Sequence, residues 1–201
     1  MPFQEELEQR VARESSERLA NHTIEVLRDD GMYRHFRCRN HGSSIDGFDV
    51  VTWPWSLCYT GDMGYYLFQR TEDMIKFMSG ACMSFDYAAQ KCVAADRDGI
   101  REFRREVFDE RLAEMVEEMK STIEDEDGSE ELKSLDEKVD EIRAAIEEYD
   151  SPHDGLRAMY ESGLFDGSDM PSCESFTYRF LFCCHAIKWL CEQLAVASAT
   201  A

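Results

Sequence analysis

The spacing of apolar residues changes along this chain, and the change falls near residue 80. Before it, segments such as MYRHFRC (residues 32–38) alternate apolar and polar side chains, the pattern of a β-strand with one solvent-facing side. After it, apolar residues recur every three or four positions, as on one face of an α-helix. Because the two patterns occupy separate stretches, the chain is predicted to be an α+β protein with an antiparallel sheet packed on helices.

Residues 1–80 predict an N-terminal helix followed by an antiparallel sheet of about five strands. Residues 4–20 have an apolar face at helical spacing, and Asp29-Asp30-Gly31 marks the turn of a first hairpin. Thr71 is expected to cap a covering helix, because acidic residues follow it where the helix dipole favours them. The strands are expected at residues 23–27, 32–38, 48–53, 56–59 and 65–70.

Residues 81–201 predict a helical region that packs with the sheet as one domain. Within about residues 101–150, two stretches with narrow apolar stripes are separated by a polar connection, which predicts an αα-hairpin whose helices pack on each other. Ser151-Pro152 ends this hairpin, and a short helix follows. The segment from about 173 to 196 is apolar around most of its circumference, so we expect a buried C-terminal helix in the core.

The chain has 42 Asp and Glu against 22 Lys and Arg, a formal net charge of −20. Nucleic acid and anionic membranes repel such a protein, so its partner is expected to be basic. Residues 101–150 contain 20 acidic and 8 basic residues. This acidic hairpin is either a solvated helical face or a docking surface whose carboxylates imitate duplex DNA, with one charge per about 1.7 Å. The partner-binding candidates of the second interpretation are Glu114, Glu117, Glu118, Glu124, Asp125 and Glu126.

The stretch TWPWSLCYTGDMGYYLFQR (residues 52–70) concentrates aromatic side chains. Trp53 and Trp55 flank a proline, and we expect one of them in the core and the other exposed. Tyr65 and the tyrosine after it must face opposite sides of a sheet if both lie in a strand. Exposed Trp and Tyr are common interface anchors. Trp55 and Tyr65 are therefore further partner-binding candidates, with simple packing as the alternative.

Signatures of catalysis are missing from the sequence, which has neither a G-x-S-x-G motif nor a P-loop. We therefore expect a protein that is not an enzyme. The glycines on both sides of Asp62 predict a tight turn, and the Asp62 carboxylate would repel a phosphate. The alternative is an enzyme acting on a small molecule or nucleotide through the loops of residues 41–62, which contain His41, Asp46 and Asp62.

The eight cysteines are scattered or adjacent, unlike those of a disulfide scaffold. Cys183 and Cys184 point about 100° apart on a helix and cannot share one metal ion, and no C-x-x-C pair occurs. We expect reduced cysteines that fill the core, and neither a metal nor another cofactor.

Neither a membrane span nor a signal peptide is expected. We find no run of about 18 consecutive apolar residues. The N-terminal residues are charged and lack the apolar segment of a signal peptide. The expected location is the cytoplasm.

Residues 22–80 resemble a group of small proteins encoded by phages, prophages and mobile elements. The group shares a strand ending in Thr-Trp-Pro, then a Gly-Asp-Met-Gly turn, then an aromatic strand ending in Arg. The matching positions are Thr52, Trp53, Pro54, Gly61, Asp62, Met63, Gly64, Phe68 and Arg70. The resemblance implies an accessory protein of a mobile element in the bacterial cytoplasm, and it implies no catalytic residue.

Small acidic phage proteins without a catalytic signature are often inhibitors of host nucleases or CRISPR effectors. We therefore expect a protein of the anti-CRISPR type that binds a host defence complex. Its acidic helices would cover a basic nucleic-acid-binding surface, so the partner would be a basic protein or ribonucleoprotein complex. The remaining alternative, beside the enzyme, is a virion or other structural component.

Overall fold

The computed structural model describes residues 2–43, 45–80, 84–123, 128–149, 152–163 and 173–199. The chain forms two compact units. The sheet unit comprises Gln4–Glu102 and Phe176–Ala201, and the helical unit comprises Met1–Phe3 and Phe103–Ser175. The helical unit is thus an insertion in the sequence of the sheet unit. The sequence pattern changes at residue 80 instead, and the C-terminal helix, expected in the core beside the sheet, belongs to the sheet unit.

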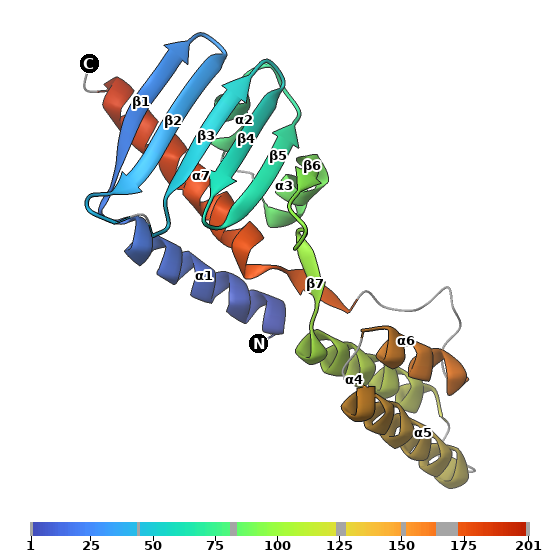
Figure 1. Ribbon diagram of the computed structural model, residues 1–201. Coiled ribbons are helices and arrows are strands. Elements are labelled where there is room, and N and C mark those ends of the chain that lie inside the picture. The colour runs from blue at the N-terminus through green and yellow to red at the C-terminus, as the bar shows by residue number, and fades with distance from the viewer. Residues whose placement is uncertain are drawn as a thin grey trace. The chain divides into compact units, whose positions relative to one another are not determined.

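The sheet unit is built on a six-stranded antiparallel sheet in which the strands follow chain order (Figure 1). Five strands form the expected meander, and the tight turns between them lie where Gly and Pro were expected to turn the chain. A sixth strand pairs with the free edge of the fifth, Phe68 opposite Cys92. The strands are β1 (His22–Asp30), β2 (Tyr33–Asn40), β3 (Phe48–Trp53), β4 (Ser56–Gly61), β5 (Gly64–Gln69) and β6 (Cys92–Ala95).

Three helices lie before the insertion: α1 (Phe3–Leu19), α2 (Met74–Met78) and α3 (Phe85–Lys91). In α1 the buried residues recur every fourth position, as the sequence pattern predicts. The cap of α2 is Asp73 and not Thr71, since the Asp73 carboxylate accepts hydrogen bonds from the backbone N–H groups of Ile75 and Lys76. A carboxylate at this position also interacts favourably with the helix dipole.

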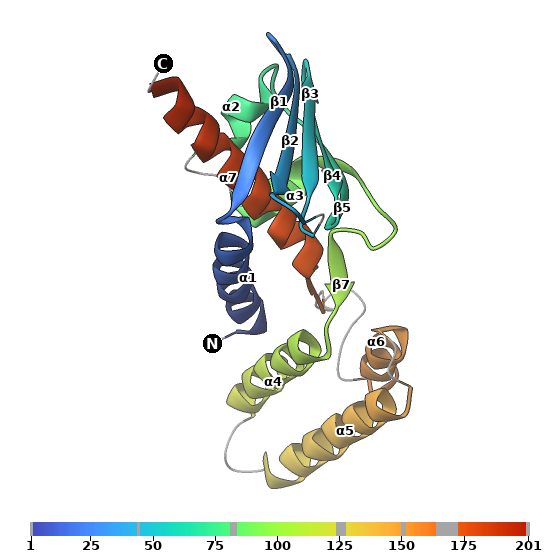
Figure 2. The ribbon, with the colours of Figure 1, turned by 60° about the vertical axis from the view of Figure 1, so that its left-hand side comes forward.

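The C-terminal helix α7 (Tyr178–Ala199) lies against one face of the sheet, with α2 and α3 on the same side (Figure 2). Its ring contacts reach the sheet, for example Phe180 with Tyr66 at 5.6 Å between ring centroids. The helix begins at residue 178 and not near 173, because Thr177 Oγ1 accepts a hydrogen bond from the N–H of Phe180 and caps it. The buried side chains of α7 are Phe180, Leu181, Phe182, Cys183, Ala186, Ile187, Leu190 and Cys191.

Among the helices of the described residues, α7 alone is long and apolar enough to be a candidate membrane span. No membrane span is expected from the sequence, because it contains no uninterrupted run of about 18 apolar residues. Burial of this helix against the sheet explains its apolar composition equally well, since the core helix of a globular protein is apolar on most sides.

The helical unit consists of α4 (Arg105–Thr122), α5 (Gly128–Tyr149) and α6 (Pro152–Glu161). An ion pair of 2.8 Å between Lys120 Nζ and Asp136 Oδ1 joins α4 to α5. Where the chain enters and leaves this unit, β7 (Arg101–Phe103) pairs with β8 (Glu174–Phe176). The unit has a core of its own, formed by Phe108, Leu112, Val116, Leu135, Val139, Ile142, Met159 and Cys173.

Candidate functional site

The predicted acidic candidates on α4 are exposed. Glu114, Glu117 and Glu118 lie on the side of the helix opposite the buried Leu112 and Val116. This follows from the helical repeat, which turns residues two, five and six positions beyond Leu112 away from the core. We call the exposed carboxylates of α4 and α5 together the acidic surface: Glu114, Glu117, Glu118, Glu130, Glu131, Asp136, Glu137, Asp140 and Glu141. Glu124, Asp125 and Glu126 fall outside the described residues.

Most of the negative charge of the protein is concentrated in this unit. Residues 103–175 contain 24 Asp and Glu against 8 Lys and Arg, which gives −16 of the total −20. Among the described residues, ion pairs involve three members of the acidic surface: Glu114 with Arg111 at 2.7 Å, Asp136 with Lys120 at 2.8 Å and Asp140 with Arg143 at 3.9 Å. In the described part of the chain, no Lys or Arg pairs with Glu117 or Glu118, so their charge faces the solvent.

The aromatic candidates lie in the sheet unit. Trp53 and Trp55 are 37% and 58% exposed, so the expectation that one of them enters the core is wrong. The indole in contact with core rings is Trp189, at 6.2 Å from Phe48. Tyr65 is 60% exposed, whereas the following tyrosine is 1% exposed, which confirms that the two face opposite sides of the sheet.

Trp55 occupies a turn that is unfavourable for its side chain. Its φ is +72°, in the left-handed region that bulky residues rarely adopt. Pro54 followed by a residue with positive φ is the pattern of a type II turn. The neighbouring segment holds this turn in place: Trp55 N–H donates to the carbonyl of Glu72 at 3.2 Å, and Arg70 N–H donates to the carbonyl of Trp55 at 3.3 Å.

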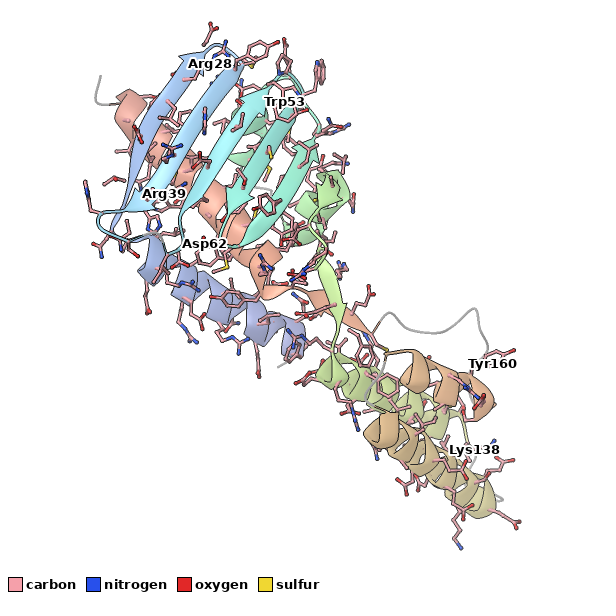
Figure 3. The ribbon with its side chains drawn as sticks, in the orientation of Figure 1. Arg28, Arg39, Trp53, Asp62, Lys138 and Tyr160 are labelled. Carbon is pink, nitrogen blue, oxygen red and sulfur yellow. The ribbon has the colours of Figure 1, made fainter. Side chains whose placement is uncertain are left out.

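The structure does not bring Trp55 and Tyr65 together. Trp55 precedes the first residue of β4, whereas Tyr65 pairs with Thr60 near the other end of that strand. With a rise of about 3.4 Å per residue, the five residue steps from Trp55 to Thr60 separate the two positions by about 17 Å along the strand. Trp53, next to Trp55, accordingly lies at the opposite end of the sheet from Asp62 (Figure 3).

The loops proposed for an enzyme lie at the same end of the sheet, but their acidic residues have structural contacts. Asp46 is 6% exposed, and its carboxylate accepts hydrogen bonds from Arg18. Asp62 is exposed, and its N–H donates to the carbonyl of Gly47 at 3.1 Å. His41 lines a pocket with other residues and contacts neither carboxylate in the hydrogen bonds of the described residues. The three side chains therefore do not form a catalytic arrangement.

The two glycines of the β4–β5 turn are required for different reasons. Gly64 has a φ of +105°, which L side chains rarely adopt. Gly61 has no such φ, but a Cβ there would lie 2.7 Å from Phe48 Cα, closer than real Cβ contacts. The tight turn predicted around Asp62 is thus present, and one of its glycines serves the close approach of β3 and β4.

A group of polar residues that sequence analysis did not single out lies on the open face of the sheet, the face opposite α7. His35 Nε2 is 2.7 Å from Asp49 Oδ2, and Arg39 Nη2 donates to Asp49 Oδ1 at 2.7 Å. Burial raises the pKa of Asp49, but the hydrogen bond with His35 and the charges of Arg39 and Arg37 lower it more, so the net pKa is below the usual 3.8. Asp49 is therefore ionised at neutral pH.

A pocket of about 610 Å³ adjoins this group. Its volume is within the range of about 300–1,000 Å³ that is usual for small-molecule sites. Its walls come from β1, β2 and the loop after β2, and they contain Thr23, Glu25, Arg37, Arg39, Asn40, His41, Gly42 and Ser43. The sequence feature that indicates this site is the alternation of His35, Arg37 and Arg39, which places all three on one face of a strand.

The described cysteines form no disulfide, and the described residues contain no cluster of three or more His, Cys, Asp or Glu able to hold a metal ion. Burial raises the pKa of Cys38 to about 12 and that of Cys191 to about 12. A thiol with such a pKa is protonated at neutral pH and is a poor nucleophile. These two cysteines act as core side chains.

Comparisons of the chain with models of protein families, with curated proteins and with solved structures find no match. A function is therefore inferred from the chemistry of two features, the acidic surface and the pocket beside Arg37 and Arg39. The acidic surface of the helical unit is suited to a cationic partner. The pocket beside Arg37 and Arg39 is suited to an anion.

Proposed function

We propose that this protein acts by binding and not by catalysis, as an inhibitor that covers a basic nucleic-acid-binding surface of a host complex with its acidic surface. The observation that supports this most is the segregation of charge. The helical unit contains −16 of the net charge of −20, although it is an insertion with a core of its own. The charge is thus concentrated on a separate compact unit, which favours a role in binding.

The number of carboxylates per length of the α5 axis resembles the number of phosphates per length of a nucleic-acid strand. Six exposed carboxylates lie between Glu130 and Glu141. At a helical rise of about 1.5 Å per residue, these residues span roughly 17 Å, or about one carboxylate per 3 Å. One strand of DNA has one phosphate per about 3.4 Å. Lys133 and Lys138 interrupt the row and reduce its net charge.

The core of the helical unit favours this use because it fixes the carboxylates in space. Leu135, Val139 and Ile142 are buried, so the opposite side of α5 has a defined direction. A preorganised charged surface loses less conformational entropy on binding than a disordered acidic tail of equal charge. Complementary charge also accelerates the encounter with a basic partner.

The resemblance of residues 22–80 to phage and mobile-element proteins supports a target in host defence. CRISPR effectors hold their guide–target duplex in a positively charged channel. A rigid row of carboxylates is chemically suited to such a channel. The partner in this proposal is a basic ribonucleoprotein complex, and binding competes with nucleic acid.

Capture of partners from a bacterial host lysate tests the proposal. The test variant replaces Glu114, Glu117 and Glu118 by Gln, which removes three charges and keeps the side-chain length and helix propensity. The control replaces Glu5, Glu6 and Glu17 of α1 by Gln, which removes three exposed carboxylates from another helix. We expect the wild type and the control to retain one basic nucleic-acid-handling complex at low salt, and the test variant to lose it.

High salt should release the complex from the wild type, because surface charges more than about 10 Å apart are screened at 0.1 M ionic strength. Equal capture by the test variant would contradict the proposal. A stable homo-oligomer on size-exclusion chromatography, with no captured partner, would favour a structural component instead.

A further inference from the structure

We propose that the pocket beside Arg37 and Arg39, on the open face of the sheet, binds a small phosphate-bearing ligand. The pocket measures about 610 Å³, and its lining includes two guanidinium groups, an imidazole and a side-chain amide. This site lies in the sheet unit. It goes beyond the binding function proposed above and does not depend on it.

Asp49 provides too few oxygens for the basic side chains around it. Its Oδ2 contacts His35 Nε2 at 2.7 Å, and its Oδ1 accepts from Arg39 Nη2 at 2.7 Å. The third basic neighbour, Arg37, has its Nε 3.6 Å from Asp49 Oδ1, beyond hydrogen-bond distance. The Asp49 carboxylate thus forms hydrogen bonds with two of its three basic neighbours, and Arg37 forms only a longer ion pair with it.

The guanidinium of Arg37 has N–H donors available for a ligand. Its other ion pair, Nη1 with Glu25 Oε2, is 3.8 Å long, and within the described residues no hydrogen bond from its guanidinium is found. A guanidinium has five N–H donors in a planar fork that matches the geometry of phosphate and carboxylate. Since Arg37 lines the pocket, an anion placed there would receive these donors.

Arg39 is held in place as a second cation of the site. Its Nη1 donates to the carbonyls of Cys38 at 2.8 Å and Phe48 at 2.5 Å, and its Nη2 donates to Asp49. Three of its hydrogen bonds therefore go to fixed acceptors, while its side chain remains 39% exposed. A guanidinium fixed in this way needs little reorganisation to receive an anion, because its remaining donors already point in set directions.

The local charge of the pocket differs from that of the whole protein. The pocket lining contains two arginines and a single carboxylate, that of Glu25, with Asp49 beside it, in a chain with a net charge of −20. The Glu25 side chain is 64% exposed on the edge strand β1, so it can turn into the solvent when an anion enters. Asn40 and His41, at the end of β2, add polar groups that can bind phosphate oxygens.

A second pocket of about 480 Å³ lies between the β1–β2 hairpin and helices α2 and α7. It differs from the pocket beside Arg37 in how its arginine is paired. Its arginine, Arg34, donates to both oxygens of Asp73, at 2.9 and 3.1 Å. This fork is filled by a carboxylate of the protein itself. The pocket beside Arg37 has a guanidinium without such a partner, which is why we assign the ligand to it.

Titrations followed by the backbone amide NMR signals of residues 37–43 test the assignment. The probes are inorganic phosphate, a nucleoside monophosphate and a single-stranded oligonucleotide. The test variant is Arg37→Gln, which removes no hydrogen bond among the described residues and only the two long ion pairs with Glu25 and Asp49. Arg28→Gln is the control, since Arg28 is exposed on the same hairpin at the end away from Arg39 (Figure 3).

We expect phosphate, the nucleoside monophosphate or both to shift these signals. Arg37→Gln should weaken binding about tenfold or more, as loss of a charge-assisted hydrogen bond does, and Arg28→Gln should leave it unchanged. Binding of phosphate as tight as that of the nucleotide would show that the phosphate group alone is recognised. Three results would overturn the proposal: no shift with either small probe, equal weakening in both variants, or much tighter binding of the oligonucleotide.

Discussion

The guanidinium of Arg18 in α1 donates hydrogen bonds to both carboxylate oxygens of Asp46, which lies 28 residues later in the β2–β3 loop. The same guanidinium donates to the hydroxyl of Tyr178 at 2.9 Å, at the start of α7. These contacts connect the N-terminal helix, a sheet loop and the core helix. Asp46 therefore stabilises the fold, although its place in a polar loop suggests a catalytic role.

Replacement of Asp46 by Ala should lower the free energy of unfolding by about 2 kcal/mol, because the partly buried Arg18 loses its carboxylate partner and keeps only the hydroxyl of Tyr178. Denaturation by urea measures this loss. Asp62→Ala is the control, since Asp62 is exposed, and we expect a change within about 0.5 kcal/mol. An Asp46→Ala protein as stable as the wild type would refute the structural role of the ion pair.

Trp55 should limit stability rather than contribute to it. Its φ of +72° is unfavourable for a bulky residue and acceptable for glycine. We expect Trp55→Gly to raise the free energy of unfolding by up to about 1 kcal/mol. Glycine relieves the backbone strain, and this gain should exceed the loss from the greater conformational entropy of the unfolded chain. Trp53→Gly, a glycine within strand β3, should lower it, and thermal unfolding distinguishes the two. A clear loss of stability in Trp55→Gly would show that the exposed indole is needed for packing.

Asp73 should contribute to stability in a pH-dependent way. The hydrogen bond from Arg34 lowers the pKa of Asp73 below its usual 3.8, with burial opposing it and the N–H groups of Lys76 and Ile75 adding to it. Because the pKa is lower in the folded state, the contribution is present above about pH 4 and is lost as the pH falls through the folded-state pKa.

Asp73→Asn keeps a capping side chain and removes the charge. It should cost about 1 kcal/mol at pH 7 and almost nothing once the pH has fallen below the lowered folded-state pKa of Asp73, where the wild type is itself protonated. Urea denaturation of both proteins across this range measures the difference. A cost that is the same at both pH values would mean that the cap, and not the ion pair with Arg34, is responsible.

The helical unit should lose stability separately from the sheet unit. Leu112 is fully buried in a core formed by residues of the helical unit. Leu112→Ala should destabilise that unit by about 3 kcal/mol through the cavity it creates. Hydrogen exchange should then become faster in α4 and α5 and stay unchanged in β2 to β5. Equal acceleration in the sheet would show that the two units unfold together.

Much of the fold follows from local sequence patterns. The first five strands were predictable because their alternation is bounded by turn residues, as in Asp29-Asp30-Gly31 and around Pro54. Cys92–Ala95 has no alternation of its own and follows a short helix, and it becomes strand β6 only because β5 offers a free edge. The cap of α2 was ambiguous, since Thr71 and Asp73 both suit the position and only tertiary contacts decide for Asp73.

The candidate sites were partly predictable. Helical periodicity correctly turned Glu114, Glu117 and Glu118 outward, because the buried stripe fixes the opposite face. The positive φ of Trp55 could not be foreseen, since it contradicts the preference of the side chain. The excess of donors at Arg37 depends on the register that places Asp49 beside it, and register is a property of the paired strands.

The central claim is that the acidic surface competes with nucleic acid for a basic site. The most direct measurement is the displacement of a labelled nucleic acid from the captured host complex by increasing amounts of this protein. The account predicts displacement by the wild type and by the Glu5, Glu6 and Glu17 control, and none by the protein with Gln at 114, 117 and 118. Displacement by all three proteins alike, or binding without displacement, would contradict it.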